Sequence, residues 1–88
     1  MHIGDVSLDL VLSAIASCVC KKVVTDMGCG WARAVLRLLV EEETAGLVLE
    51  LEVPRGVSLD RARASALTCP ALGMVLHLLR KIEVRAGG

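Results

Sequence analysis

The first part of the chain carries a pattern of apolar residues that predicts a long helix. This helix is expected to start after Asp5 or Ser7, either of which can cap a helix, and to run to about Met27, where Gly28 is a common stop signal. At helical spacing the polar residues form one narrow stripe, and apolar residues cover the rest of the circumference. The stripe contains Asp9, Ser13, Ser17 and Cys20. We therefore expect a central helix that other elements cover from several directions.

The middle of the chain changes to the two-residue period of half-buried strands. Residues 33–40 and 47–53 both place leucine, valine or alanine at every second position. The turn residues Thr44, Ala45 and Gly46 lie between them, so the two strands are predicted to form an antiparallel hairpin. This pairing would bring Arg37 close to Glu50 or Glu52, as a modest cross-strand ion pair.

The last third predicts two further helices and a strand. Ser58 is expected to cap a helix that ends near Thr68, and Cys69-Pro70 is expected to begin another that reaches about Leu79. Residues 80–85 again alternate and predict a closing strand. The order is helix, strand, strand, helix, helix, strand. It indicates one α+β domain over residues 1–88, in which the long helix packs against an antiparallel sheet.

Composition narrows the class of protein. Of the 88 residues, 55% are hydrophobic, and Trp31 is the only aromatic residue. A short chain cannot easily bury so much apolar surface, so we expect an obligate homodimer. Ten basic and ten acidic residues give no basic stripe for nucleic acid. The apolar run 6–19 is too short to span a membrane, and the start has no basic segment of a signal peptide, so a cytoplasmic protein is expected.

Cys18 and Cys69 are the strongest candidates for chemistry. Lys21 and Lys22 follow Cys18 at positions i+3 and i+4, where either could stabilise a thiolate. Cys69 precedes Pro70 at the predicted helix start, where unpaired N–H groups and the helix dipole favour a thiolate. The alternative is that both cysteines pack as small hydrophobic residues. Without a secretory signal, the cysteines are expected to be reduced, catalytic or buried rather than a disulfide framework.

The remaining metal-binding and titratable residues suggest no second site. Cys18 and Cys20 lie two apart on a helix and face different ways, so they cannot readily bind one metal or each other. Cys29 lies in a glycine-flanked loop and is interpreted as an exposed, incidental thiol. His77 lies in an apolar run and is expected to be a core or edge residue. Neither a metal nor another cofactor is expected.

Two segments around the cysteines resemble the OsmC/Ohr family. Residues 8–18, rich in leucine and alanine and ending in Ala-Ser-Cys, resemble the family's central helix, and residues 66–72 resemble its second cysteine in a Cys-Pro helix start. The hairpin between them and the closing strand also follow the family's order. The resemblance covers about residues 7–85 and implies an intertwined dimer. We expect a short member without the family's N-terminal strands.

The resemblance also implies a mechanism, in which Cys18 attacks an organic hydroperoxide and Cys69 resolves the product to a disulfide that a dithiol reductant reopens. The family's activating arginine lies in the missing strands, and Leu8, next to Asp9, stands where its peroxidases carry a glutamate. Lys21, Lys22 or an arginine of the other subunit is expected to take over the activation, with Asp9 in a supporting role.

Two other functions fit the same residues. A non-enzymatic OsmC-like dimer could bind a hydrophobic ligand or a protein partner, with the cysteines serving as packing. Alternatively, Cys69 could carry sulfur, since a Cys-Pro helix start also resembles the small sulfur carriers of the TusA family. Those proteins place the motif after a first strand and have a second proline where this chain has Leu72.

Overall fold

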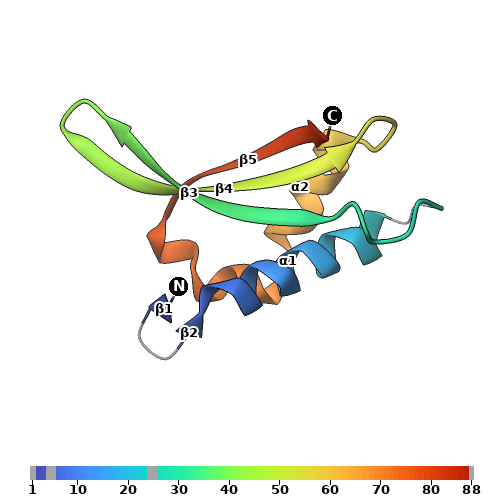
Figure 1. The fold of residues 1–88 in the computed structure, drawn as a ribbon, viewed down its shortest axis with the longest axis horizontal. Coiled ribbons are helices and arrows are strands. Elements are labelled where there is room, and N and C mark those ends of the chain that lie inside the picture. Colours follow the sequence, from blue (N-terminus) through green and yellow to red (C-terminus); the bar gives the residue numbers. More distant parts are fainter. Residues whose placement is uncertain (1, 4–5, 24–25, 88) are drawn as a thin grey trace.

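The chain forms a small α+β structure with one three-stranded sheet and two α-helices (Figure 1). The computed structural model describes residues 2–3, 6–23 and 26–87. The elements are β1 (His2–Ile3), β2 (Val6–Ser7), α1 (Leu8–Val23), β3 (Arg33–Glu41), β4 (Thr44–Pro54), α2 (Leu59–Leu67), the 3₁₀ helices η1 (Pro70–Met74) and η2 (Leu76–Leu78), and β5 (Leu79–Gly87).

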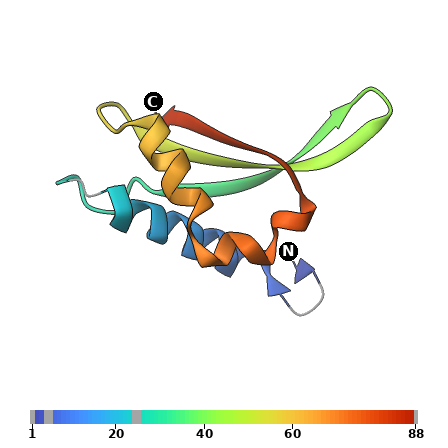
Figure 2. The same cartoon turned by 180° about the vertical axis from the view of Figure 1, so that it is seen from behind.

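Both helices lie on the same side of the sheet, and the far end of the β3–β4 hairpin projects beyond them (Figures 1 and 2). Every second residue of β4 faces this helical layer, because side chains alternate between the two faces of a strand. Leu49, Leu51 and Val53 are almost fully buried there, in one cluster with Ile15 and Val19 of α1. A long apolar helix packed against the sheet is therefore confirmed, but it is not covered from all directions, since Leu10 of α1 is 72% exposed.

The sheet is mixed rather than antiparallel. The order is β3-β4-β5, in which β3 and β4 are antiparallel as predicted, but β4 and β5 are parallel. The expectation of a wholly antiparallel sheet is therefore wrong. The parallel pairing follows from the connection between β4 and β5, because α2 and the 3₁₀ helices carry the chain back to the end of the sheet where β4 started.

Two turns differ from the prediction. The helix α1 ends at Val23, and Asp26 and Met27 already form a turn, so the predicted extension to Met27 is wrong. Gly28 does supply the reversal, with φ of 73°. The hairpin turns at residues 42–43, where Glu43 has φ of 65°, and the predicted turn residues 44–46 belong to β4. The candidate cap Asp5 lies outside the described residues.

The segment after Cys69 is not the single helix that was predicted. Cys69 is the N-cap residue and Pro70 follows at the helix start, as expected, but η1 is a 3₁₀ helix of only five residues. The backbone leaves helical geometry at Val75, with φ of −121° and ψ of 0°. A five-residue helix has little dipole, so the argument that a long helix stabilises a Cys69 thiolate does not hold.

Two local predictions are confirmed. Ser58 caps α2, since its hydroxyl oxygen accepts a hydrogen bond from the Arg61 backbone N–H at 3.2 Å. The Arg37 side chain reaches Glu50 at 2.6 Å, and Arg85 of β5 contacts the same carboxylate oxygen at 2.9 Å. Glu50 is thus buried on the face of the sheet away from the helices, held between two arginines.

No helix in the described part of the chain is both long and apolar enough to cross a membrane.

Candidate functional site

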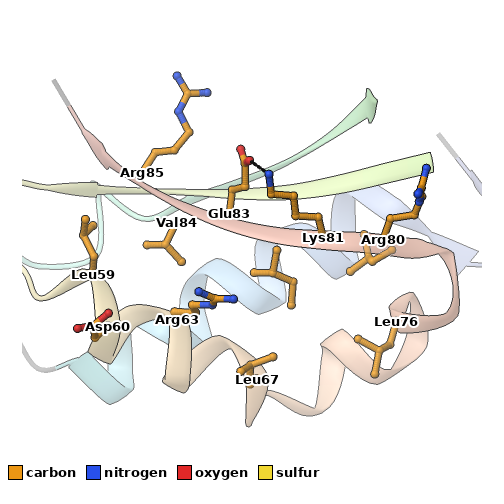
Figure 3. A pocket seen from close by; sticks show the side chains of 12 residues that line it. Leu59, Asp60, Arg63, Leu67, Leu76, Arg80, Lys81, Glu83, Val84 and Arg85 are labelled. Atoms are coloured by element: carbon orange, nitrogen blue, oxygen red, sulfur yellow. Dashed lines mark ion pairs between the residues drawn. The ribbon is translucent and has the colours of Figure 1, made fainter. Parts of the chain in front are cut away.

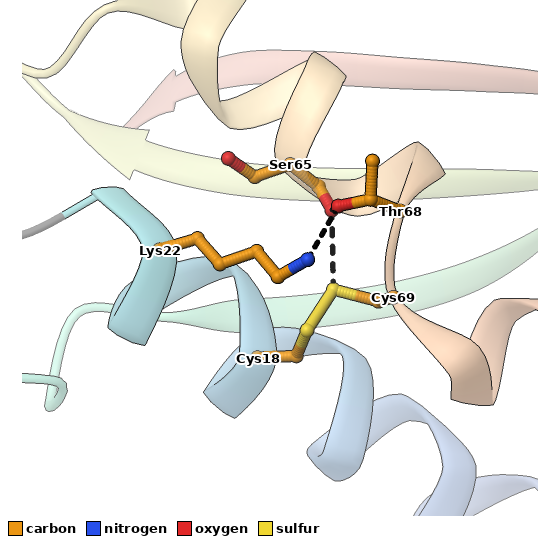
Figure 4. Close-up of a disulfide and its surroundings, with 5 residues drawn as sticks. All are labelled: Cys18, Lys22, Ser65, Thr68 and Cys69. Carbon is orange, nitrogen blue, oxygen red and sulfur yellow. Dashed lines mark hydrogen bonds between the residues drawn. A yellow bond between two sulfur atoms is a disulfide. The ribbon is translucent and has the colours of Figure 1, made fainter.

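A disulfide joins Cys18 of α1 to Cys69, the residue that opens η1 (Figure 4). The two residues are 51 positions apart in sequence, and their Cα atoms lie 6.1 Å apart, within the usual range for a disulfide. All four cysteines of the chain are paired. The expectation that the cysteines are reduced rather than a disulfide framework is therefore wrong for this structure.

The packing of the two helices explains why these cysteines meet. The face of α2 toward α1 consists of Ala62 and Ala66, both fully buried. Side chains this small let the two helix backbones approach closely. The N–H of Cys69 then donates to the Ala66 carbonyl oxygen at 3.1 Å, which turns the chain toward α1 as soon as α2 ends. Cys69 arrives opposite Cys18, at the side of α1.

A lysine ammonium group lies beside this disulfide (Figure 4). Lys22, one helical turn after Cys18, donates from Nζ to the Thr68 hydroxyl oxygen at 2.6 Å. The Thr68 hydroxyl in turn donates to the Ser65 carbonyl oxygen at 2.8 Å, which fixes the oxygen that Lys22 contacts. The sequence predicted a cation from Lys21 or Lys22. Both lysines are exposed, but Lys22 is held by this hydrogen bond, whereas Lys21 makes no such contact with a described residue.

The two sulfur atoms have different surroundings. Cys69 is 3% exposed, and its Sγ lies 3.2 Å from the Ser65 carbonyl oxygen, which can accept a hydrogen bond from the thiol when the pair is reduced. Cys18 is partly exposed. Cys18 is therefore the less buried cysteine of the pair, and Cys69 is the one held inside.

Asp9 is not brought to the cysteine pair. It lies nine residues before Cys18 on the same helix, which is about 13 Å along the helix axis. Together with Ser13 and Arg33, it instead lines a cavity of about 270 Å³ between α1 and β3. Asp9 therefore lies away from the Cys18–Cys69 pair within one chain, and its supporting role stays a prediction.

A second disulfide joins Cys20 to Cys29, nine residues apart, with 5.7 Å between the Cα atoms. The interpretation of Cys29 as an incidental thiol is wrong. Cys20 is 3% exposed, so its predicted place on a polar stripe is wrong as well. The prediction that Cys18 and Cys20 face different sides of the helix is confirmed, because each forms a disulfide with a different cysteine. A signal was present in the sequence, since Gly28 reverses the chain after the helix and returns Cys29 to it.

His77, expected in the core or at its edge, is exposed.

A larger cavity lies elsewhere, in an open groove of about 750 Å³ between α2 and β5 (Figure 3). Its lining includes Leu59, Leu67, Leu76, Ile82, Val84 and Arg63. Sequence analysis did not find this groove, because it depends on how β5 lies against α2. Arg80, Lys81, Glu83 and Arg85 of β5 also line this groove. In Figure 3 the side chains of Lys81 and Glu83 rise on the side of β5 away from Val84. There Lys81 and Glu83 form an ion pair at 2.7 Å, which lowers the pKa of Glu83 and raises the pKa of Lys81.

No three His, Cys, Asp or Glu side chains of the described residues are grouped to hold a metal ion. Comparison with protein-family models, with curated proteins and with solved structures finds no match to this chain. The OsmC-like resemblance therefore depends on the two cysteine segments quoted for it, and the site must be interpreted from its own geometry.

Proposed function

We propose that Cys18 and Cys69 form a redox-active pair that reduces organic hydroperoxides, in a small OsmC-like protein. The observation that carries this proposal is the disulfide between a partly exposed cysteine and a buried one, with the ammonium group of Lys22 beside it. A peroxidatic cysteine must be reachable, and a resolving cysteine must lie within bonding distance. Cys18 and Cys69 satisfy these two requirements in that order.

The proposed reaction runs from the dithiol form. The Cys18 thiolate attacks one oxygen of the hydroperoxide, the O–O bond breaks, and the alcohol leaves after taking up a proton. Cys18 is thereby oxidised to a sulfenic acid. The Cys69 thiol then attacks the Cys18 sulfur, the S–O bond breaks, and water leaves as the disulfide forms. A dithiol reductant returns the pair to two thiols by exchange through a mixed disulfide.

Lys22 is proposed to stabilise the Cys18 thiolate. Its ammonium group is anchored by the Thr68 hydroxyl, so it stays near the cysteine pair instead of extending into solvent. Lys22 also has a second support, since the Arg61 guanidinium donates to its carbonyl oxygen at 3.4 Å. A fixed positive charge favours the ionised form of a neighbouring thiol. In the peroxidases of the family that the chain resembles, an arginine has this role.

The direct test is peroxide consumption by the reduced protein. We expect turnover of cumene hydroperoxide with a dithiol reductant, accompanied by a Cys18–Cys69 disulfide identified by peptide mapping. Cys18→Ser should abolish turnover, and Cys69→Ser should stop the reaction at a sulfenic acid that a dimedone probe can trap. The double variant Cys20→Ser, Cys29→Ser is the control and should retain turnover. If Cys18→Ser consumes peroxide as fast as the wild type, the proposal is wrong.

The role of Lys22 has a matched control in Lys21. Lys22→Met should slow the reaction of Cys18 with peroxide about tenfold at neutral pH, and the loss should shrink as the pH rises and the thiol ionises without help. Lys21→Met removes the same charge one position earlier and should leave the rate within about twofold of the wild type. Equal effects from the two variants would contradict the assignment to Lys22.

A further inference from the structure

The outer edge of β5 is open to another strand. β5 pairs with β4 on one side, and no strand among the described residues pairs with its other side. A free edge of nine residues presents unpaired N–H and C=O groups that readily add a further strand. Leucines in the groove beside this edge are also poorly covered, since Leu59, Leu67 and Leu76 are 42%, 59% and 52% exposed. The edge and the groove thus form one continuous surface that is suited to an extended partner.

We propose that the partner is a second copy of this chain, with β5 pairing antiparallel to β5 of the second copy around a two-fold axis at Val84. The two sheets would join into one sheet of six strands, and the groove leucines of both copies would meet on its helical side. If residue i of one copy lies opposite residue j of the other, then residue j of the first copy also lies opposite residue i of the second. Glu83 therefore faces Arg85 of the second copy, twice by symmetry.

The charges on β5 select this register. Centring the axis on Glu83 would pair the two strands over their full length, but it would set Glu83 against Glu83 and Lys81 against Arg85. Like charges directly opposite each other are destabilising. Centring the axis on Val84 removes both clashes and replaces them with acid–base pairs on the outer face. Arg85 already contacts Glu50, so the new pair would extend an existing ion-pair network across the interface.

The open edge of β3 is a poorer candidate for self-association. Its charged residues are Arg33, Arg37 and Glu41, and Arg37 is already bound to the buried Glu50, so a second copy offers only the exposed Glu41 at the strand end as an opposite charge. Leu38 and Val40 near the end of the hairpin are 68% and 70% exposed, but the end itself carries the like charges of Glu41, Glu42 and Glu43. β3 lacks what β5 combines with its free edge, which is a groove lined by exposed leucines and an acid–base pair near its centre that complements its own copy.

Two charge variants at β5 test the pairing between residues 83 and 85. The wild type should have about twice the 9.3 kDa mass of one chain in light scattering. Glu83→Arg places arginine against arginine in the homodimer and should weaken association at least tenfold. Arg85→Glu places glutamate against glutamate and should do the same. A mixture of the two variants should form a heterodimer, because both acid–base pairs between residues 83 and 85 are then restored. Each variant alone should associate only weakly.

The controls separate this surface from the other exposed leucines. Leu67→Glu changes a groove residue and should dissociate the dimer, whereas Leu10→Glu, at a residue of α1 that is 72% exposed, should not. The proposal is overturned if the wild type is a monomer, if the two charge variants fail to associate when mixed, or if Leu38→Arg dissociates the dimer while Glu83→Arg does not. Circular dichroism of each variant confirms that the monomer remains folded.

This inference goes beyond the proposed redox function and can fail separately from it. The groove side of α2, with Leu59 and Leu67, is a different face of that helix from the one that carries Ser65 and Thr68 beside the disulfide (Figures 3 and 4). Glu83→Arg should therefore leave the reaction of Cys18 with peroxide unchanged. A wild type that consumes peroxide as a monomer contradicts only the dimer, and a wild type that is a dimer but consumes no peroxide contradicts only the proposed function.

Discussion

The two disulfides should contribute unequally to stability, and the difference can be calculated from the lengths of the loops they close. Cys18 and Cys69 close a loop of 51 residues, whereas Cys20 and Cys29 close one of nine. The chain-entropy relation gives about 4 kcal/mol for the longer loop and about 2.6 kcal/mol for the shorter one. A domain of 88 residues has a total stability of about 4–13 kcal/mol, so the Cys18–Cys69 disulfide accounts for a large share of it.

Urea unfolding followed by Trp31 fluorescence measures this difference, because Trp31 is the only tryptophan and packs against the core. With a slope of about 1 kcal/mol per molar urea, the double variant Cys18→Ala, Cys69→Ala should lose about 4 M of its midpoint. Cys20→Ala with Cys29→Ala is the matched control and should lose about 2.6 M by the same slope. An equal or larger loss in the control would refute the reasoning from loop length.

The stabilisation of the folded state by the Cys18–Cys69 disulfide also affects the proposed redox function. A disulfide that stabilises the folded state by about 4 kcal/mol is harder to reduce than an unconstrained one by about 90 mV. A strong dithiol is therefore required to reopen the Cys18–Cys69 pair, in agreement with the proposed dithiol reductant. A monothiol such as glutathione should leave the pair oxidised at concentrations where dithiothreitol reduces it, as thiol counting would show.

Three further predictions concern the fold. Ser58→Ala removes the cap of α2 and should cost about 1 kcal/mol in urea unfolding. Glu50→Ala leaves its two arginines unpaired, but both are half exposed and can be hydrated, so the cost should be about 1–2 kcal/mol, and Glu50→Gln should recover part of it. The pKa of Glu83 is lowered by Lys81, so the stability that their pair contributes is present above the ordinary glutamate pKa and is lost as the pH falls through the lowered value. Lys81→Met should abolish this acid-dependent loss in pH-dependent thermal unfolding.

The sequence predicted those parts of the fold that depend on local patterns. The apolar circumference of α1, the two-residue period of β3 and β4, and the cap at Ser58 all act over a few residues. The Arg37–Glu50 pair could also be predicted, since a hairpin fixes the register, and in this register Glu50 lies diagonally across from Arg37. These predictions required no knowledge of how distant segments meet.

The predictions that failed concern distant contacts and backbone geometry. A strand pattern does not say which strand is the neighbour, and the parallel pairing of β4 with β5 follows only from the helical connection between them. Cys69-Pro70 correctly marked a helix start, but the 3₁₀ geometry and the break at Val75 have no clear signal in composition. The groove needed the position of β5 against α2 and could not be derived from either segment alone.

The arrangement of the two disulfides explains how α1 can stay packed in the fold when the Cys18–Cys69 disulfide is reduced. Cys18 and Cys20 lie two residues apart on one helix and face different sides, so each cross-link ties α1 to a different partner. Cys20–Cys29 holds the end of the helix to the loop that follows it, a contact that does not depend on α2. If Cys18–Cys69 opens during catalysis, the buried contacts of Ala62 and Ala66 hold α1 in place, and the short Cys20–Cys29 link supports them without being required for turnover. The reduced protein can then remain folded with Cys18 and Cys69 close enough to join again, which is the condition that a repeating peroxidase cycle imposes.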